Sequence, residues 1–259
     1  MEFFSHWGLL LAAAFVAGAL NSVAGGGSFL TLPALVFTGV PPVIANATGT
    51  VALFPGYVAG AWGFREDMQP PPGLSMRAVV ITSLIGGMAG AALLLVTPDA
   101  VFRKVVPWLL LAATAMFAFG PQLRAWAARR SSAQAPACSQ PQSHVKGLLG
   151  MLVVAVYGGY FNGGLGILLL ALFGLLGQTQ LNAMNGMKNL VSALLTAIAV
   201  AIYAVGGLVY WKQALIMMIA ATLGGYIGAR VARKLPATWI RWGIVVTGLV
   251  MSVLFFLRG

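Results

Sequence analysis

Two glycine-rich stretches inside apolar segments carry the chemistry that this sequence offers. Their residues are Asn21, Gly25, Gly26, Gly27 and Ser28 in the first stretch, and Asn162, Gly163 and Gly164 in the second. Glycine costs a helix about 1 kcal/mol relative to alanine, so contiguous glycines should interrupt it. An interruption begins a new half-helix, whose N-terminus carries roughly half a positive charge and binds anions. The stretches therefore predict a site for an anionic substrate. Close helix packing is the alternative use of glycine, and it is what we expect of the spaced residues Gly86, Gly87, Gly90, Gly224, Gly225 and Gly228.

Lys188 is the one formal charge well inside an apolar segment. It lies about nine residues, or about 13 Å, into a segment that starts near Thr179, close to the middle of a hydrocarbon core about 30 Å thick. Inserting a lysine there costs about 2.5–3.5 kcal/mol, which points to a functional role. Contact with a bound anion, a bond to backbone carbonyls and snorkelling to the surface are the three explanations. We expect contact with the anion.

Uncharged hydrogen-bond donors accompany Lys188. Asn182, Asn185 and Asn189 recur at three and four residues, which places them on one helical face. The matching segment of the first half carries Asn46, Thr48 and Thr50. Amide and hydroxyl donors suit an oxyanion, so these residues join the candidate substrate site, and hydrogen bonding between helices is the alternative role.

The composition shows that the elements holding this site are membrane helices. Of 259 residues, 60% are hydrophobic and 7% charged, whereas a soluble domain carries about 25% charged residues. The net charge of +11 comes from basic residues between apolar segments, which indicates loop bias and not nucleic-acid binding. The single cysteine, Cys138, excludes an internal disulfide and a cysteine-based metal cage. Because no acid pair, His–acid couple or G-x-S-x-G elbow is visible, we expect no enzyme, no metal site and no cofactor.

Eight apolar segments follow one another, at residues 7–37, 43–64, 74–96, 101–119, 147–176, 179–206, 208–230 and 237–257. Six have the length of a spanning helix, about 20 residues. The two that contain the glycine stretches are longer, and each could be two half-length helices that meet at the break. Residues 121–146 are rich in Ser, Gln, Ala and Pro, which indicates a mobile linker. We divide the chain into a first membrane repeat (1–120), a cytoplasmic linker loop (121–146) and a second membrane repeat (147–259).

The two halves correspond to each other at a fixed spacing. A shift of 137 positions places Gly26 on Gly163 and Gly27 on Gly164, and further along it places Gly49 on Gly186. This correspondence indicates an internal duplication. Two broken segments at corresponding places in two such halves are typical of transporters that bind substrate between the repeats.

Basic residues predict the orientation of the halves. If each broken segment is a re-entrant hairpin, each half crosses the membrane three times and the halves are inverted. One face then collects ten basic residues, namely Arg65, Arg77, Arg124, Arg129, Arg130, Lys146, Arg230, Arg233, Lys234 and Arg241, and the other collects Arg103, Lys104, Lys212 and Arg258. If each broken segment spans the membrane once, the split is six against eight. The positive-inside rule favours the uneven split.

We therefore expect an all-α polytopic membrane protein with two inverted repeats. Each repeat is a broken re-entrant helical hairpin plus three transmembrane helices. Both termini lie outside, and the loops at 65–75 and 121–146 lie in the cytoplasm.

Several motifs resemble the TauE/SafE sulfite exporter family over nearly the whole chain outside 121–146. In the first half they are NSVAGGGSFLTLPAL at 21–35 and ANATGT at 45–50. In the second half they are YGGYFNGGLG at 157–166, KNL at 188–190 and GGYIGAR at 224–230. The resemblance implies a multi-pass permease with duplicated halves that transports sulfite, sulfonates or other small sulfur-containing or organic anions. Asn162 departs from the pattern, because relatives often carry glycine there.

The sequence thus predicts a permease for small anions, exporting sulfite or organosulfonate-like anions through a midplane site formed by the two broken helices. A non-transporting assembly subunit of a membrane complex is one alternative. A permease for a small carboxylate or another sulfur compound is the other. The expected partners are the anionic substrate and the lipid bilayer, and the expected location is the bacterial inner membrane. The sequence does not specify an oligomeric state.

Overall fold

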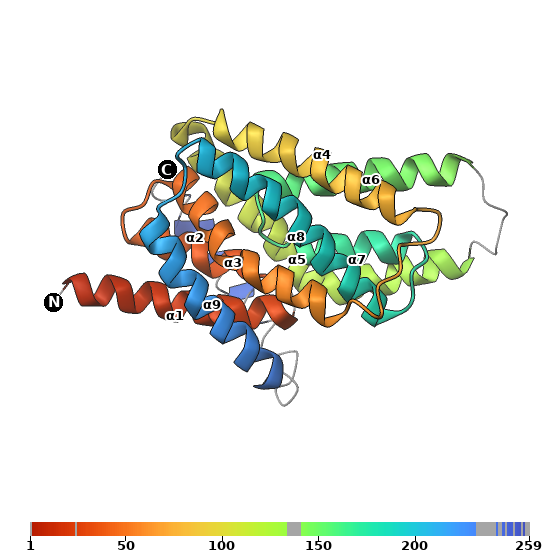
Figure 1. Cartoon of the computed structure of the whole chain (residues 1–259), viewed down its shortest axis with the longest axis horizontal. Helices are drawn as coiled ribbons and strands as arrows, with labels where there is room; N and C mark the ends of the chain where they lie inside the picture. Colours follow the sequence, from red (N-terminus) through yellow and green to blue (C-terminus); the bar gives the residue numbers. More distant parts are fainter. Residues whose placement is uncertain are drawn as a thin grey trace.

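The structure of the chain, a computed structural model, is all-helical in the part that it describes, which comprises residues 2–23, 25–133, 141–231, 242, 245–246, 248–250, 252–254 and 256. Its labelled helices are α1 (Glu2–Val23), α2 (Ser28–Phe37), α3 (Pro42–Gly63), α4 (Met76–Leu95), α5 (Asp99–Ala133), α6 (Pro141–Tyr160), α7 (Leu165–Leu175), α8 (Leu181–Val205) and α9 (Trp211–Val231) (Figure 1). The described residues between 242 and 256 are helical as well. Cys138, Arg233, Lys234, Arg241 and Arg258 lie outside the described residues.

Two expectations about helix length are wrong. The first broken segment is not a pair of half-length helices, because α1 has 22 residues and only α2, with 10, is short. Helix α5 continues to Ala133 and α6 begins at Pro141, so the expected linker is helical at both of its ends. Alanine and arginine, frequent between 121 and 133, are strong helix formers. The middle of the linker, 134–140, lies outside the described residues.

Both predicted breaks are present. Helix α1 ends at Val23 and α6 at Tyr160, and the short helices α2 and α7 begin at Ser28 and Leu165. Each pair of positions is 137 residues apart, which is the spacing found in the sequence.

The two breaks turn at different residues. Gly25 has φ of +80° in the first break, and its counterpart in the second is Asn162, which does not have a positive φ. The left-handed residue of the second break lies two positions later, at Gly164 with φ of +74°, whereas its counterpart Gly27 has φ of −58°. Since a left-handed backbone favours glycine, the shifted turn explains how Asn162 is accommodated.

Helices α1 and α9 pack with their backbones in contact. A Cβ on Gly18 would lie 1.9 Å from the carbonyl oxygen of Ala221, and one on Gly224 would lie 1.9 Å from that of Phe15. Only glycine permits such an approach, as is common between membrane helices.

Helices α4 and α6 repeat this contact. A Cβ on Gly159 would lie 2.4 Å from the carbonyl oxygen of Gly87, and one on Gly90 would lie 2.1 Å from that of Val156. The spacing is the same in both interfaces. Gly224 follows Ala221 by three residues and Phe15 precedes Gly18 by three. Likewise, Gly90 follows Gly87 by three residues and Val156 precedes Gly159 by three. The first helix of each half therefore packs on the fourth helix of the other half in the same way (Figure 1).

Helices α3 and α8 cross the centre and run antiparallel. A Cβ on Gly60 would meet the Asn189 side chain, and one on Gly186 would meet Phe64. Residue numbers thus fall on α8 as they rise on α3. In Figure 1, α2 and α7 lie on opposite sides of the centre along the long axis.

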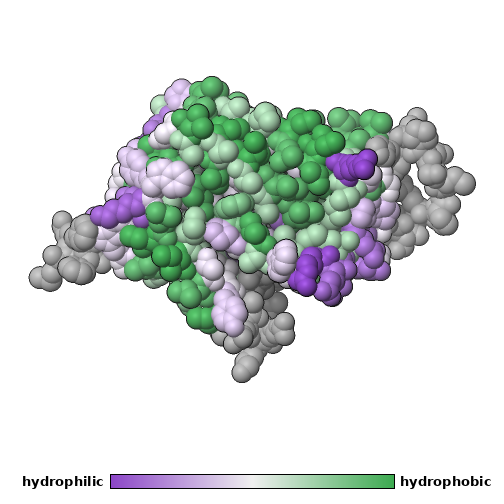
Figure 2. Space-filling view, in the orientation of Figure 1, coloured by the Kyte–Doolittle hydropathy of each residue, from purple (hydrophilic) through white to green (hydrophobic). Residues whose placement is uncertain are grey.

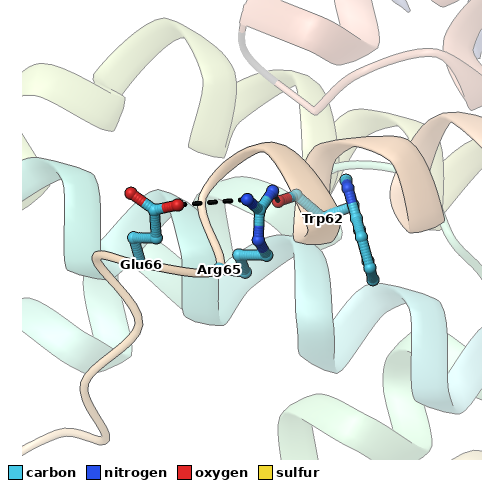
Figure 3. A network of polar contacts seen from close by, with 3 residues as sticks. All are labelled: Trp62, Arg65 and Glu66. Carbon is cyan, nitrogen blue, oxygen red and sulfur yellow. Dashed lines mark hydrogen bonds and ion pairs between the residues drawn. The ribbon is translucent and has the colours of Figure 1, made fainter.

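One face of the molecule is apolar between two polar ends. In Figure 2 a broad hydrophobic face separates hydrophilic residues gathered at the two ends of the long axis. Within the described part, α3, α4 and α8 each have the length and hydropathy of a membrane span. At the end of α3 the Arg65 guanidinium lies 5.0 Å from the Trp62 ring centre and 3.0 Å from a Glu66 carboxylate oxygen (Figure 3). Aromatic and basic residues at a helix end are typical of the membrane interface.

Candidate functional site

The two breaks meet each other inside the molecule. A Cβ on Gly25 would lie 3.0 Å from the Cα of Gly166, the second residue of α7. The first break therefore lies directly against the start of the second short helix. Gly25 through Ser28 and Asn162 through Gly164 are all buried. The structure brings together the two stretches that the sequence singled out.

A group of three side chains, Asn21, Tyr57 and Asn162, links the breaks; we call it the amide–tyrosine cluster. The Tyr57 hydroxyl donates a hydrogen bond of 3.2 Å to Asn162 Oδ1, and the Asn21 side chain lies beside the preceding residue of α3, because a Cβ on Gly56 would lie 3.8 Å from Asn21 Nδ2. Asn21, Tyr57 and Asn162 are 7%, 4% and 2% exposed. Two atoms of the cluster, Asn21 Oδ1 and Asn162 Nδ2, are buried without a hydrogen-bond partner. Such atoms are rare in native interiors and point to a ligand or water.

The carbonyls of the second break are bound by side chains from other parts of the chain. Asn46 Nδ2 donates to the Tyr160 carbonyl at 2.9 Å, and the Tyr157 hydroxyl donates to the Gly163 carbonyl at 2.6 Å. The Tyr203 hydroxyl donates to the Gly159 carbonyl. These bonds satisfy acceptors that the end of a helix leaves exposed.

The N-termini of the two short helices are not capped by side chains. Neither Gly27, before α2, nor Gly164, before α7, provides a side-chain cap. In the first turn of α2, Ser28 Oγ and Thr31 Oγ1 are buried without a hydrogen-bond partner. Uncapped N-termini present backbone N–H groups and a positive dipole end, the arrangement that binds anions.

Lys188 is buried on α8, with 3% of its surface exposed. This burial rules out the snorkelling explanation, which requires the ammonium group to reach water. The next residue, Asn189, lies against Gly60, which is one turn beyond Tyr57 on α3. Lys188 therefore lies beside the part of α3 that follows Tyr57, about one helical turn along α3 from that residue. Asn185, one turn before Asn189 on the same helix, is half-buried.

Three predicted site residues on α3 have protein partners. Asn46 binds the second break, as described above. The Thr48 hydroxyl accepts a bond of 3.1 Å from the backbone N–H of Tyr210, and the Thr50 hydroxyl donates to the Asn46 carbonyl at 2.8 Å. The two threonines thus make contacts between and within helices, which was the alternative role for them.

Sequence reasoning missed Tyr57, Tyr157 and Tyr203. Each lies inside an apolar segment, and the hydroxyl of each donates a hydrogen bond to a residue at the second break. A signal was available, because a buried tyrosine hydroxyl must find a partner. Which partner it finds depends on the packing of distant helices, and no local pattern contains that information.

Metal-binding side chains do not cluster in the described part of the chain. No three of its His, Cys, Asp and Glu residues lie close enough to hold an ion.

Comparison with known proteins agrees with this architecture. Residues 10–255 match the family described as Sulfite exporter TauE/SafE. A probable membrane transporter protein of Haemophilus influenzae is 29% identical over 257 residues, covering 94% of this chain and 92% of the relative. The probable membrane transporter protein ORF9 of Sinorhizobium sp is 27% identical, covering 94% and 90%. The probable membrane transporter protein YfcA of Escherichia coli K12 is 27% identical, covering 95% and 87%.

No solved structure matches the chain. The family match extends over nearly the whole length, including both breaks, and the named relatives are transporters and not enzymes. The chain is therefore a multi-pass membrane transporter that belongs to the TauE/SafE sulfite exporter family.

Proposed function

We propose that this transporter is a permease for small oxyanions that exports sulfite or organosulfonate-like anions. Its substrate site is the place where the two breaks meet, formed by Asn21, Asn162 and the N-termini of α2 and α7, with Lys188 contributing the full positive charge. The single observation that carries the proposal is the contact of Gly25 with Gly166, which places the start of α7 against the first break.

The numbers of open hydrogen-bond donors and acceptors at the second break support the binding of an anion. The carbonyls of Gly159, Tyr160 and Gly163 already accept bonds from side chains. The amide nitrogen of Asn162 and the uncapped start of α7 are donors. An excess of donors over acceptors suits a ligand that is rich in acceptor oxygens.

We further propose that the two halves are inverted repeats in the bacterial inner membrane, with both termini outside. The antiparallel course of α3 and α8, each the third helix of its half, supports this arrangement. So do the positions of α2 and α7 on opposite sides of the centre (Figure 1). The exposed basic residues Arg65, Arg77 and Lys146 would lie on the cytoplasmic side.

Efflux of radiolabelled sulfite from proteoliposomes tests the proposed function. The wild-type protein should release sulfite or a simple sulfonate in a saturable way, and Gly26→Leu should abolish release because the new side chain would fill the buried break. Gly8→Leu is the matched control, since a Cβ at Gly8 meets nothing within 4 Å, and it should transport normally. Both variants should elute as the wild type in size exclusion.

The same assay separates the alternatives. If the protein releases a carboxylate in preference to every sulfur oxyanion, the proposed substrate class is wrong, while the proposed location of the site is unaffected. A well-folded protein that releases none of these anions would favour the assembly role and contradict the proposal.

A further inference from the structure

The turns that end α2 and α7 share one pattern of backbone hydrogen bonds. After α2, the N–H of Val40 donates to the Leu35 carbonyl at 3.1 Å, and after α7 the N–H of Gln178 donates to the Phe173 carbonyl at 3.0 Å. In each turn the preceding residue is a left-handed glycine, with φ of +89° and +88°. Both are Schellman turns, in which the residue after the glycine commonly makes an apolar contact with its helix. Val40 and Gln178 therefore occupy the same position in the two halves.

The side chains at this position differ in polarity. Val40 and Gln178 are both buried, at 6% and 8% exposed. Gln178 Nε2 donates a hydrogen bond of 2.7 Å to the Gln69 carbonyl, which belongs to the connection between α3 and α4. Because a carbonyl oxygen can only accept, the amide nitrogen must face it, and Gln178 Oε1 is left buried without a partner. A half-satisfied amide where the other half has valine breaks a rule of protein interiors, and such exceptions point to function.

The connection between α3 and α4, residues 64–75, lies against the second half of the chain. A Cβ on Gly186 would lie 3.0 Å from Met68 Cγ, and one on Gly147 would lie 3.4 Å from Leu74 Cδ2. The connection thus contacts α6 and α8 as well as the turn after α7. Helix α7 runs from the second break to that turn. A displacement of the turn away from the connection would therefore also move the helix that begins at the proposed site.

We propose that Gln178 is a latch residue that closes the cytoplasmic side of the anion site. In the closed arrangement that the structure describes, its amide holds the end of α7 on the 64–75 connection but leaves one oxygen unsatisfied. When the turn moves away, water reaches both polar atoms of the amide, and the second break opens toward the cytoplasm. Val40 has no polar atom to hydrate, so the turn after α2 lacks this means of release. The inference rests on the proposed function and adds the residue that controls access to its site.

The experiment measures the separation between the connection and the turn in the purified full-length protein without anion. Spin labels are attached to Glu66→Cys, in the connection, and to Leu181→Cys, directly after the turn, in a Cys138→Ser background. Both labelled positions are exposed. Pulsed dipolar spectroscopy then gives the distances between the labels, a short one for the closed arrangement and a longer one for the open arrangement.

Two substitutions of the latch should shift these distances in opposite directions. Gln178→Met keeps the length of the side chain and removes both polar atoms, so it should favour the closed arrangement about two- to tenfold, raise the melting temperature and slow sulfite export. Gln178→Glu places a carboxylate opposite the Gln69 carbonyl, so it should favour the longer distance by a similar factor. Gln180→Met is the matched control, because Gln180 is exposed and makes no side-chain cap bond, and it should keep the wild-type distances.

The outcomes separate a latch from a structural bond and from the proposed function. If Gln178→Met lowers the melting temperature and leaves the distances unchanged, the glutamine only fastens the connection and the latch is wrong. Equal distances in the wild type and in Gln178→Glu also overturn it. Opposite shifts in a protein that releases no anion would keep the latch and overturn the permease, because the distances are measured without anion.

Discussion

At the scale of single residues, the polar side chains in this membrane domain converge on the second break. Three tyrosine hydroxyls and the Asn46 amide bind residues 159–163 of that break, and they come from α3, α6 and α8. Lys188 adds the only charged side chain among the buried residues that the structure describes. A charge in such a place needs a partner, and we expect the transported anion to be one.

Substitution of Lys188 should remove the stabilisation that added sulfite provides. Lys188→Met removes the charge that the proposed site offers to the anion, so the rise in melting temperature on adding sulfite should disappear. Lys188→Arg keeps the charge and should keep part of that stabilisation. Thermal unfolding of the purified protein with and without sulfite measures both effects. A different result would contradict this role. If Lys188→Met melts at a lower temperature than the wild type but is still stabilised by sulfite, the lysine forms a structural bond to backbone carbonyls.

Local sequence preference predicts the positions of the helix breaks but not the hydrogen-bond partners of the buried tyrosines. The glycine breaks were predictable because the cost of glycine in a helix is a property of the chain itself, and both breaks begin and end at matching positions. The helical ends of the linker were not predicted, because its Ser, Gln and Pro residues are typical of loops while its Ala and Arg residues extend α5 to Ala133. The partners of Tyr57 and Tyr203 depend on contacts across 105 and 44 residues, which no local pattern encodes.

At the scale of helices, glycine–carbonyl contacts set the distances between the two halves. Gly18 and Gly224 join α1 to α9, and Gly159 and Gly90 join α4 to α6. The equivalence of the two interfaces is what the proposed duplication of the halves would produce. It also means that the break following α1 and the break following α6 are each held by the opposite half.

A methyl group placed in one of these contacts should push the helices apart. Gly18→Ala would set a Cβ 1.9 Å from the Ala221 carbonyl oxygen, and overpacking of this kind typically costs about 1–3 kcal/mol. We expect a lower unfolding midpoint in detergent and slower anion release. Gly8→Ala, on the same helix, meets nothing within 4 Å and should match or slightly exceed the stability of the wild type, by up to about 1 kcal/mol. Equal midpoints for the two variants would contradict the packing role of Gly18.

At the scale of the whole molecule, the polar ends define how the protein lies in the bilayer. The Trp62, Arg65 and Glu66 group marks one end (Figure 3). Lys212, whose ammonium lies 5.3 Å from the Trp7 ring centre, marks the other, at the start of α9. The apolar face between them (Figure 2) is the part that lipid would cover.

Cysteine labelling in intact cells tests the orientation. In a Cys138→Ser background, a membrane-impermeant thiol reagent should label Lys212→Cys from outside and should label Glu66→Cys only after the cells are opened. Both positions are exposed, so access depends on the side of the membrane alone. The reverse pattern would place the termini inside, and labelling of both from outside would exclude the inverted arrangement.

The occupied carbonyls of the second break have an electrical consequence. Unwound carbonyls in broken helices are where many transporters coordinate Na⁺, but here those of Gly159, Tyr160 and Gly163 already accept hydrogen bonds. Because a carbonyl oxygen has two lone pairs, a cation would have to share each of these oxygens with a side-chain donor. An anion that crossed at this break as proposed, without a companion cation, would carry net charge. Membrane voltage would then set the direction of transport, at about 2.3 kcal/mol per charge for each 100 mV, and the negative interior of a bacterial cell would drive the anion outward.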